Sequence, residues 1–404
     1  MHTIHSLNAH RMTDYIILQY FNLNRLLLLI LGLWPYQRTK LVEFQLYLVF
    51  GILVSIIPAL LTPLLTLDCT VSLLIKILPP VLIIMICTIK YFSFIINAHT
   101  VKQIMDQLQH ICNNLIDENE VAIMQNYGNR TRSYTALFII YALCNFIIFL
   151  LLPLLPKIAG VILFINESQL HHTVYIMTEY FVDREKYFYL ILLHMDAAVC
   201  IGAIALIGVG TMFIGYLKHT CAMFEICSYR IKHAIMLETE STQLRDDMIR
   251  KKIKCAVDIH RKGIEFSTFV ISSFDWLFCL LIAIIVLCLS VDLFCLFQTV
   301  SSGHNVEEFV VHFSCLSILL LYLFLANYAA QEIIDHYNHI FITAYSIQWY
   351  AASICIQKMI LFLLQRGAKA FNLNIGGLFI GSLETAGMLL STSVSYFTVL
   401  YSTR

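Results

Sequence analysis

Apolar residues are concentrated in seven long runs along the 404-residue chain. A membrane-spanning helix needs about 20 predominantly apolar residues, and each of these runs is long enough. An eighth, shorter apolar stretch at 347–364 contains Gln348, Gln357 and Lys358 and makes a poorer span. The pattern predicts an all-α protein with seven transmembrane helices, at 43–65, 71–96, 134–156, 188–217, 266–298, 309–330 and 376–402.

The prolines divide the chain into two halves. All seven precede residue 157, so the helices of the last 248 residues can run on without interruption. The stretch 218–265 is rich in helix formers and predicts a helical hairpin that extends spans four and five, while 331–369 extends span six and returns through 347–364. A break is expected at 371–377. We therefore divide the chain into a cytoplasmic N-terminal, interfacial segment (1–42), six transmembrane helices with their extensions (43–330), cytoplasmic anchor helices (331–375) and a last transmembrane helix (376–404).

Composition supports a membrane protein. Of the residues, 59% are hydrophobic and 13% are charged, whereas soluble proteins carry about 25% charged residues. The 26 basic and 26 acidic residues balance, so charge gives no reason to expect a nucleic-acid partner. Most of the 13 cysteines lie in apolar runs and read as small buried hydrophobes. The apolar stretch 26–33 is too short for a span and predicts an interfacial helix, with Trp34 and Tyr36 at headgroup level.

Basic residues orient the predicted spans. With the N-terminus in the cytoplasm, the inside segments 1–42, 97–133, 218–265 and 331–375 hold 20 Lys and Arg in total, and the outside segments hold 4. Because basic loops stay on the cytoplasmic side, the N-terminus is predicted inside and the C-terminus outside. Of the two glycosylation sequons, at Asn129 and Asn166, only Asn166 would then carry a glycan.

The last predicted helix has a polar stripe. At 100° per residue, hydroxyl-bearing and other polar positions fall in one sector of about 140°. Such a stripe either packs against other helices or lines water, and Glu384 slightly favours a water-lined cavity. The residues of this sector are Glu384, Thr385, Met388, Ser391, Thr392, Ser395, Thr398, Val399, Ser402 and Thr403.

Other polar residues give weaker signals. Asp196 and Asp275 lie in predicted spans, either in a local hydrogen bond or as a polar anchor of a ligand cavity. His336 is expected to be a surface or packing residue, and the basic stretch 250–254 to be a solvated face beside the inner leaflet. No GxSxG, Walker, HExxH or GxGxxG motif occurs, so the sequence predicts neither an enzyme nor a cofactor.

Several segments, most of them in the last 75 residues, carry a resemblance to insect odorant receptors, in a form similar to those of ants and bees. Gly32-Leu-Trp-Pro35 looks like the opening motif of that family. The other matching segments are Cys221-Ala-Met-Phe-Glu-Ile-Cys-Ser-Tyr-Arg-Ile-Lys-His233, Ala330-Gln-Glu-Ile-Ile-Asp-His336, Ile347-Gln-Trp-Tyr350, Gln357-Lys-Met-Ile-Leu361, Gly376-Gly377, Ser382-Leu-Glu-Thr385 and Ser393-Val-Ser-Tyr-Phe-Thr-Val-Leu400.

The resemblance implies a subunit of a ligand-gated, non-selective cation channel. In that family a variable odorant-binding subunit joins an obligate co-receptor in a heterotetramer, and this chain looks like the variable subunit because it lacks the co-receptor's longer second cytoplasmic connection. The last helix would line the pore, with gate positions at Val399 and Thr403. The pore and gate residues implied are Glu384, Met388, Thr392, Ser395, Val399 and Thr403.

The resemblance also places a ligand pocket in the outer half of the membrane, between spans two, three, four and six. Such a lining favours small, mostly apolar volatiles, because burial of apolar surface would supply most of the affinity. Counting residues by depth puts Ile83, Ile84, Cys87, Asn145, Phe146, Phe149, Tyr189, Leu193, Asp196, Phe313, Leu316 and Leu320 in this zone.

Two alternatives stay open at this point. A gustatory-type receptor channel would have the same architecture, and a seven-helix receptor coupled to G proteins would have the opposite orientation. The odorant-receptor reading places the protein in the plasma membrane of olfactory sensory neurons, with the co-receptor and a volatile ligand as partners.

Overall fold

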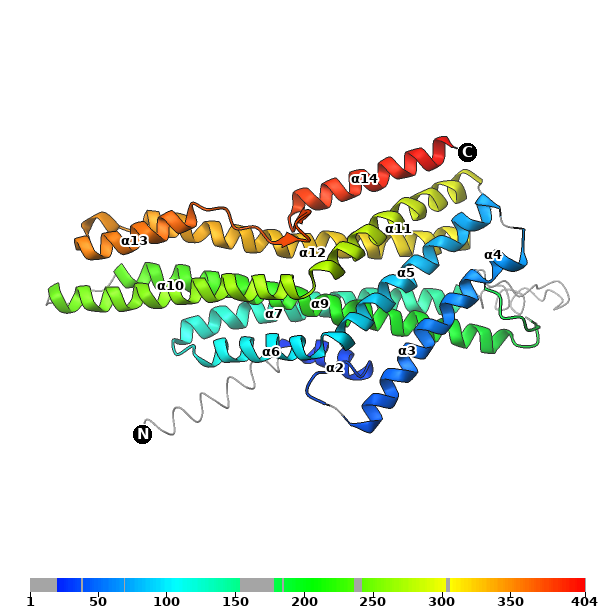
Figure 1. Cartoon of the computed structure of the whole chain (residues 1–404), viewed down its shortest axis with the longest axis horizontal. Coiled ribbons are helices and arrows are strands. Elements are labelled where there is room, and N and C mark those ends of the chain that lie inside the picture. The colour runs from blue at the N-terminus through cyan, green and yellow to red at the C-terminus, as the bar shows by residue number, and fades with distance from the viewer. Residues whose placement is uncertain are drawn as a thin grey trace.

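The computed structural model describes residues 20–37, 39–68, 70–152, 178–183, 185–235, 242–302 and 306–403. These residues are almost entirely helical, as predicted, and form one elongated bundle (Figure 1). The elements are α2 (Asn22–Ile30), α3 (Lys40–Leu61), α4 (Pro63–Thr66), α5 (Val71–Ile96), α6 (Ala98–Asn113), α7 (Glu118–Leu151), α9 (Phe188–Ile235), α10 (Thr242–Ser273), α11 (Asp275–Ser302), α12 (Val306–Ser346), the 3-10 turn η3 (Trp349–Ala351), α13 (Ile354–Gly367), β1 (Asn374–Ile375), β2 (Phe379–Ile380) and α14 (Leu383–Ser402).

Six helices in the described part of the chain are long and apolar enough to cross a membrane: α3 with α4, α5, α7, α9, α11 and α12. They coincide with the first six predicted spans. The seventh, α14, has 20 residues and can also cross a bilayer core of about 30 Å. Its hydroxyl side chains make it less apolar than the other six.

The long helices of the second half confirm the argument from the prolines. α9 contains 48 residues, which corresponds to about 72 Å, and α12 contains 41. With α10 and α13 they form the end of the molecule that lies away from the start of α5 (Figure 1). α7 extends in the same way, since it begins at Glu118 and not near the predicted start of span three.

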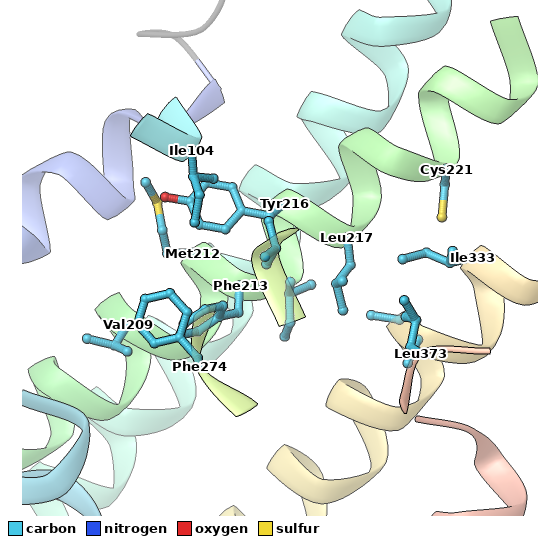
Figure 2. Packing of buried hydrophobic residues seen from close by; sticks show 14 of the residues in the cluster. Ile104, Val209, Met212, Phe213, Tyr216, Leu217, Cys221, Phe274, Ile333 and Leu373 are labelled. Atoms are coloured by element: carbon cyan, nitrogen blue, oxygen red, sulfur yellow. The ribbon is translucent and has the colours of Figure 1, made fainter. Parts of the chain in front are cut away.

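The fifth span is broken where continuity was expected. α10 ends at Ser273 and α11 begins at Asp275, so the helix is interrupted at Phe274. The Phe274 ring is fully buried and packs edge-on against Phe213 of α9, with 4.8 Å between ring centroids (Figure 2). No proline or glycine lies at this position. The break therefore follows from the tertiary packing of an aromatic side chain.

The predicted break before the last span is a small β-hairpin. β1 and β2 pair antiparallel through Asn374–Ile380 and Ile375–Phe379. Gly376 and Gly377 form the turn with φ of +60° and +68°, a region in which side chains are strained. As a result α14 begins at Leu383, seven residues later than predicted, where Ser382 accepts a hydrogen bond from the Thr385 amide as an N-cap.

The N-terminal helix α2 packs inside the protein. Leu27 and Leu28 are buried against α9 at Gly208, and Asn24 is fully buried with its Nδ2 donating to Thr211 Oγ1 at 2.7 Å. Trp34 is buried as well, while Tyr36 stays half-exposed. The apolar face of this helix and the Trp34 ring are thus covered by protein, and the expected position of this segment at headgroup level stays a prediction.

Candidate functional site

A cavity of about 200 Å³ lies beside the N-terminal halves of α5 and α12. α3, α5, α7, α9, α11 and α12 all contribute to its wall. The wall is mostly apolar, and Gly202 of α9 lets Cys87 of α5 approach closely, because a Cβ at Gly202 would lie 3.2 Å from the Cys87 sulfur. Pockets for drug-sized ligands have volumes of about 300–1,000 Å³. This cavity therefore suits a smaller, apolar molecule.

Polar groups stand at two places in this wall. Lys76 of α5 and Glu308 of α12 form an ion pair at 3.2 Å, and both are partly exposed. Deeper in, the fully buried Asp292 of α11 contacts His312 of α12, with 3.0 Å between Oδ1 and Nδ1. These groups can orient a ligand that carries one hydroxyl, carbonyl or amine, while the rest of the wall provides apolar contact.

The structure brings half of the predicted ligand residues together around this cavity. Six line it, and all come from α5 and α7: Ile83, Ile84, Cys87, Asn145, Phe146 and Phe149.

The other six predicted ligand residues, on α9 and α12, lie elsewhere. Tyr189, Leu193 and Phe313 point outward and are more than half exposed. Leu316 and Leu320 pack into the hydrophobic core, and Asp196 is partly buried beside the cavity without lining it.

Four ionisable lining residues are missing from the predicted set: Lys76, Asp292, Glu308 and His312. Asp292 could have been found, because it is an acidic residue within the fifth apolar run and such residues usually face a partner or a cavity. His312 and Asp292 are 20 residues apart on different helices, so their contact depends on the packing of α11 against α12.

A second cavity, of about 120 Å³, lies next to the hairpin. Tyr322 of α12 lines it together with Gly381, Thr385 and Leu389 at the base of α14. Lys90 of α5 contacts Tyr322: it lies one turn from Cys87, which lines the first cavity, and its Nζ is 3.4 Å from the centroid of the Tyr322 ring. Lys90 is buried, and its Nζ has no hydrogen-bond partner among the described residues.

The last helix is attached to the bundle along one edge. Thr385, Leu389 and Ser393 are buried, while Glu384, Met388, Ser395, Val399 and Thr403 of the predicted pore set are exposed and Thr392 is intermediate. α14 lies at the periphery of the chain beside α11 (Figure 1). Apart from Thr385, the polar stripe therefore faces mostly away from the rest of this chain.

The two other acidic residues can now be placed. Asp275, at the start of α11, accepts a hydrogen bond from the Gly376 amide, which ties the hairpin turn to the break at Phe274. Asp196 is partly buried, and no contact between it and the nearby His194 is found among the described residues. His194 instead forms hydrogen bonds with Ser55 and Tyr180. Asn166 lies outside the described residues, and the predicted orientation in the membrane stays a prediction.

Comparison with known proteins identifies the family. A profile of the family described as 7tm odorant receptor matches residues 70–394. The fold is similar to the insect olfactory receptor OR5 from Machilis hrabei in complex with eugenol, with a TM-score of 0.77 at 15% identity, covering 98% of this chain and 100% of that one. A second structure of the same receptor gives a TM-score of 0.76 at 16% identity, with 97% and 100% coverage.

No curated protein sequence matches the chain. The comparisons favour neither the gustatory receptor nor the G-protein-coupled receptor, and the matched family is one of receptors and not of enzymes. With its match over residues 70–394 and its seven-helix fold, the chain belongs to the 7tm odorant receptor family.

Proposed function

We propose that this chain is the odorant-binding subunit of a ligand-gated, non-selective cation channel. The observation that carries the proposal is the cavity of about 200 Å³ shared by six helices, with Asp292 and His312 as its buried polar pair. An olfactory receptor of the same fold binds eugenol, a small organic molecule, which supports a ligand of similar size here. The expected ligand is a small, mostly apolar volatile with at most a few polar groups.

A ligand opens a channel only if it binds the open arrangement better than the closed one. In our proposal the odorant acts through α9, α11 and α12, the helices that line both cavities. Movement of α5 against α12 would displace Lys90 over the Tyr322 ring, and Tyr322 lines the cavity that reaches Thr385 and Leu389 of α14. Outward movement of α14 would then open the path along its polar stripe.

The geometry of α14 supports assembly with further subunits. The stripe of α14 faces mostly away from its own chain, so a closed pore needs further subunits around this face. We propose a heterotetramer with an odorant co-receptor, in the plasma membrane of olfactory sensory neurons. Thr403 at one gate position is polar, so the co-receptor subunits would supply most of a hydrophobic seal.

The first experiment measures odour-evoked current in oocytes that express this chain alone and then with an insect co-receptor, across a panel of volatiles. We expect current only when both are present. Current from this chain alone would contradict the heteromeric proposal. Silence in both cases, with surface expression confirmed, would contradict the channel proposal for this panel.

Cavity variants test the ligand site. Phe146→Trp adds bulk to the cavity wall and should shift the response toward smaller volatiles. The potency of the volatiles that activate the native chain should fall at least tenfold, because overpacking costs about 1–3 kcal/mol. Phe313→Ala is the matched control: Phe313 is an aromatic residue of α12 that does not line the cavity. Equal effects of the two substitutions would argue against this cavity as the odorant site.

Gate variants test the pore. Val399 is 57% exposed on α14, so Val399→Trp should block or reduce current while surface expression stays unchanged. Thr403→Arg places a cation near the end of the same stripe and should reduce cation conductance through repulsion. Unaltered currents in both variants would rule out the gate assignment.

A further inference from the structure

Four metal-ligating side chains converge at the junction of α9 and α12, away from both cavities. A sulfur of Cys221, a carboxylate oxygen of Glu332 and a ring nitrogen of His336 all lie within 4.8 Å of one another. Glu225 approaches the same point, with 4.0 Å between its Oε2 and His336 Nε2. Figure 2 shows Cys221 on α9 across from Ile333, the residue of α12 that follows Glu332.

The spacing of these residues is that of a two-helix metal site. Cys221 and Glu225 are four residues apart on α9, and Glu332 and His336 are four residues apart on α12. Residues at i and i+4 share one face of a helix, so each helix directs two ligand groups toward the other. Thiolate, imidazole and carboxylate are the groups that bind Zn²⁺ in proteins, usually four at a time in a tetrahedron.

The imidazole of His336 is already oriented for a metal. Its Nδ1 lies 2.7 Å from the backbone carbonyl oxygen of Glu332 and must carry the proton of that bond, because a carbonyl only accepts. This leaves a lone pair on Nε2, which now accepts from the Tyr127 hydroxyl at 2.5 Å. A metal-bound histidine typically shows this arrangement, with the second ring nitrogen donating to a carbonyl or carboxylate.

The surrounding charges fit a divalent cation. Lys218 forms a buried ion pair with Glu332 Oε2, and Arg130 lies 3.9 Å from Oε1 of the same carboxylate. One thiolate, two carboxylates and a neutral imidazole around a divalent ion give a net charge of −1, which the neighbouring cations Lys218 and Arg130 compensate. Lys218 can stay on Oε2 while Oε1 binds the metal, so the ion pair would support the carboxylate ligand.

We propose that Cys221, Glu225, Glu332 and His336 bind a divalent transition-metal ion of the Zn²⁺ type, which joins α9 to α12 beyond the cytoplasmic ends of the predicted spans. Binding releases the Cys221 thiol proton to solvent and forms the sulfur–metal bond. Tetrahedral Zn²⁺ needs about 3.4–3.7 Å between ligand atoms, given bonds of about 2.0–2.3 Å. The cluster therefore closes by about 1 Å on binding. His336 and Glu225 are partly exposed and provide access from solvent.

The test uses the purified full-length chain and Co²⁺ as a spectroscopic probe. We expect one Co²⁺ per chain, with tetrahedral visible bands and a thiolate-to-cobalt charge-transfer band, and displacement by Zn²⁺. Cys221→Ser should abolish the charge-transfer band, and His336→Gln should weaken binding at least tenfold. The matched controls are Cys227→Ser on α9 and His339→Gln on α12, which should leave the spectrum unchanged. A missing thiolate band in the native chain, or a band that persists in Cys221→Ser, would overturn the proposal.

Two further measurements keep the result independent of a folding defect. Zn²⁺ should raise the unfolding temperature of the native chain and of both controls, but not of Cys221→Ser or His336→Gln, since only a state that binds metal is stabilised. Tyr127→Phe removes the hydroxyl that occupies His336 Nε2 and should tighten binding by up to about tenfold, the equivalent of one hydrogen bond. Unchanged or weaker binding in Tyr127→Phe would exclude Nε2 as a ligand atom.

Discussion

α9 and α14 show two different ways of placing a helix in this protein. In α9 all 20 residues from Ala205 to Phe224 are buried, so the helix is surrounded by its own chain. α14 also has 20 residues, but only Thr385, Leu389 and Ser393, a single line at four-residue spacing, are buried. α9 is the axis around which the chain folds. α14 is attached to that fold at one edge and leaves most of its surface for other contacts.

The largest loss of stability is expected when α9 loses the carboxylate of α7 that pairs with its Arg230. Arg230 of α9 forms two short bonds to the buried Glu120, with 2.6 Å from Nε to Oε1 and 2.7 Å from Nη2 to Oε2. Glu120→Ala should lower the free energy of unfolding by about 3 kcal/mol, because a largely buried guanidinium is left without its counter-charge. Thermal unfolding of the purified chain measures this. Glu118→Ala, in the same helical turn but exposed, should cost under about 0.5 kcal/mol.

Acid should loosen the packing of α9 against α10 and α12. His260 of α10 is buried between Phe224 and Tyr337, and burial, together with the charge of Arg366, lowers its pKa from 6.5 to about 4. Below pH 6.5 the unfolded chain takes up a proton that the folded chain does not. Stability is therefore lost as the pH falls from about 6.5 to 4, by up to about 3 kcal/mol.

Unfolding temperatures measured at pH 7.5, 6 and 5 test this expectation. The native chain should lose stability over this range faster than His260→Phe, in which no proton can be taken up at this position. Parallel pH profiles for the two proteins would show that His260 does not carry the effect.

On α14 the two faces should respond differently. Leu389 is 4% exposed, and Leu389→Ala should destabilise the chain by about 2 kcal/mol through lost burial and the cavity left behind. Val399→Ala, on the exposed surface, should change stability by less than about 0.5 kcal/mol. A similar cost for both substitutions would mean that α14 is as fully packed as α9.

The smallest effect is expected where the two regions join. Asp275 holds the hairpin turn through the Gly376 amide. Asp275→Asn keeps an acceptor oxygen but removes its charge, which should weaken the contact by about 1 kcal/mol. Hydrogen exchange of the segment 371–380 should become about fivefold faster, while exchange along α9 stays the same. Faster exchange in both regions would contradict a local role for this contact.

Much of the fold could be predicted from the sequence, because hydrophobic run length and the distribution of prolines are local properties. The predicted second span, 71–96, coincides with α5, and the long helices α9 and α12 run on as expected. The interruption at Phe274 could not be predicted, since it depends on where the ring packs against Phe213. The pair Gly376-Gly377 did indicate a break in the helix. Only the structure shows that the two glycines form the turn of a hairpin and that the last span begins later, at Leu383.

The cavity residues show the same limit. Residues chosen by depth on α5 and α7, such as Cys87 and Phe146, line the cavity, but those chosen on α9 and α12 do not. Depth is fixed by the distance along a span, whereas the direction of a side chain depends on the rotation of its helix. Near its start α9 is apolar on both its buried and its exposed sides, as Leu192 and Leu193 show, so its sequence has no polar face from which that rotation could be read.

The hydroxyl groups of α14 have one more consequence. Thr392 and Ser395 each donate their only hydroxyl proton to a carbonyl four residues earlier in the same helix, with distances of 2.9 Å. Thr398 and Thr403 likewise donate to carbonyls of their own helix. Each oxygen therefore turns its lone pairs outward and has no proton left to offer. At these four positions the stripe presents oxygen atoms with negative partial charge, which favour a nearby cation over an anion without a carboxylate.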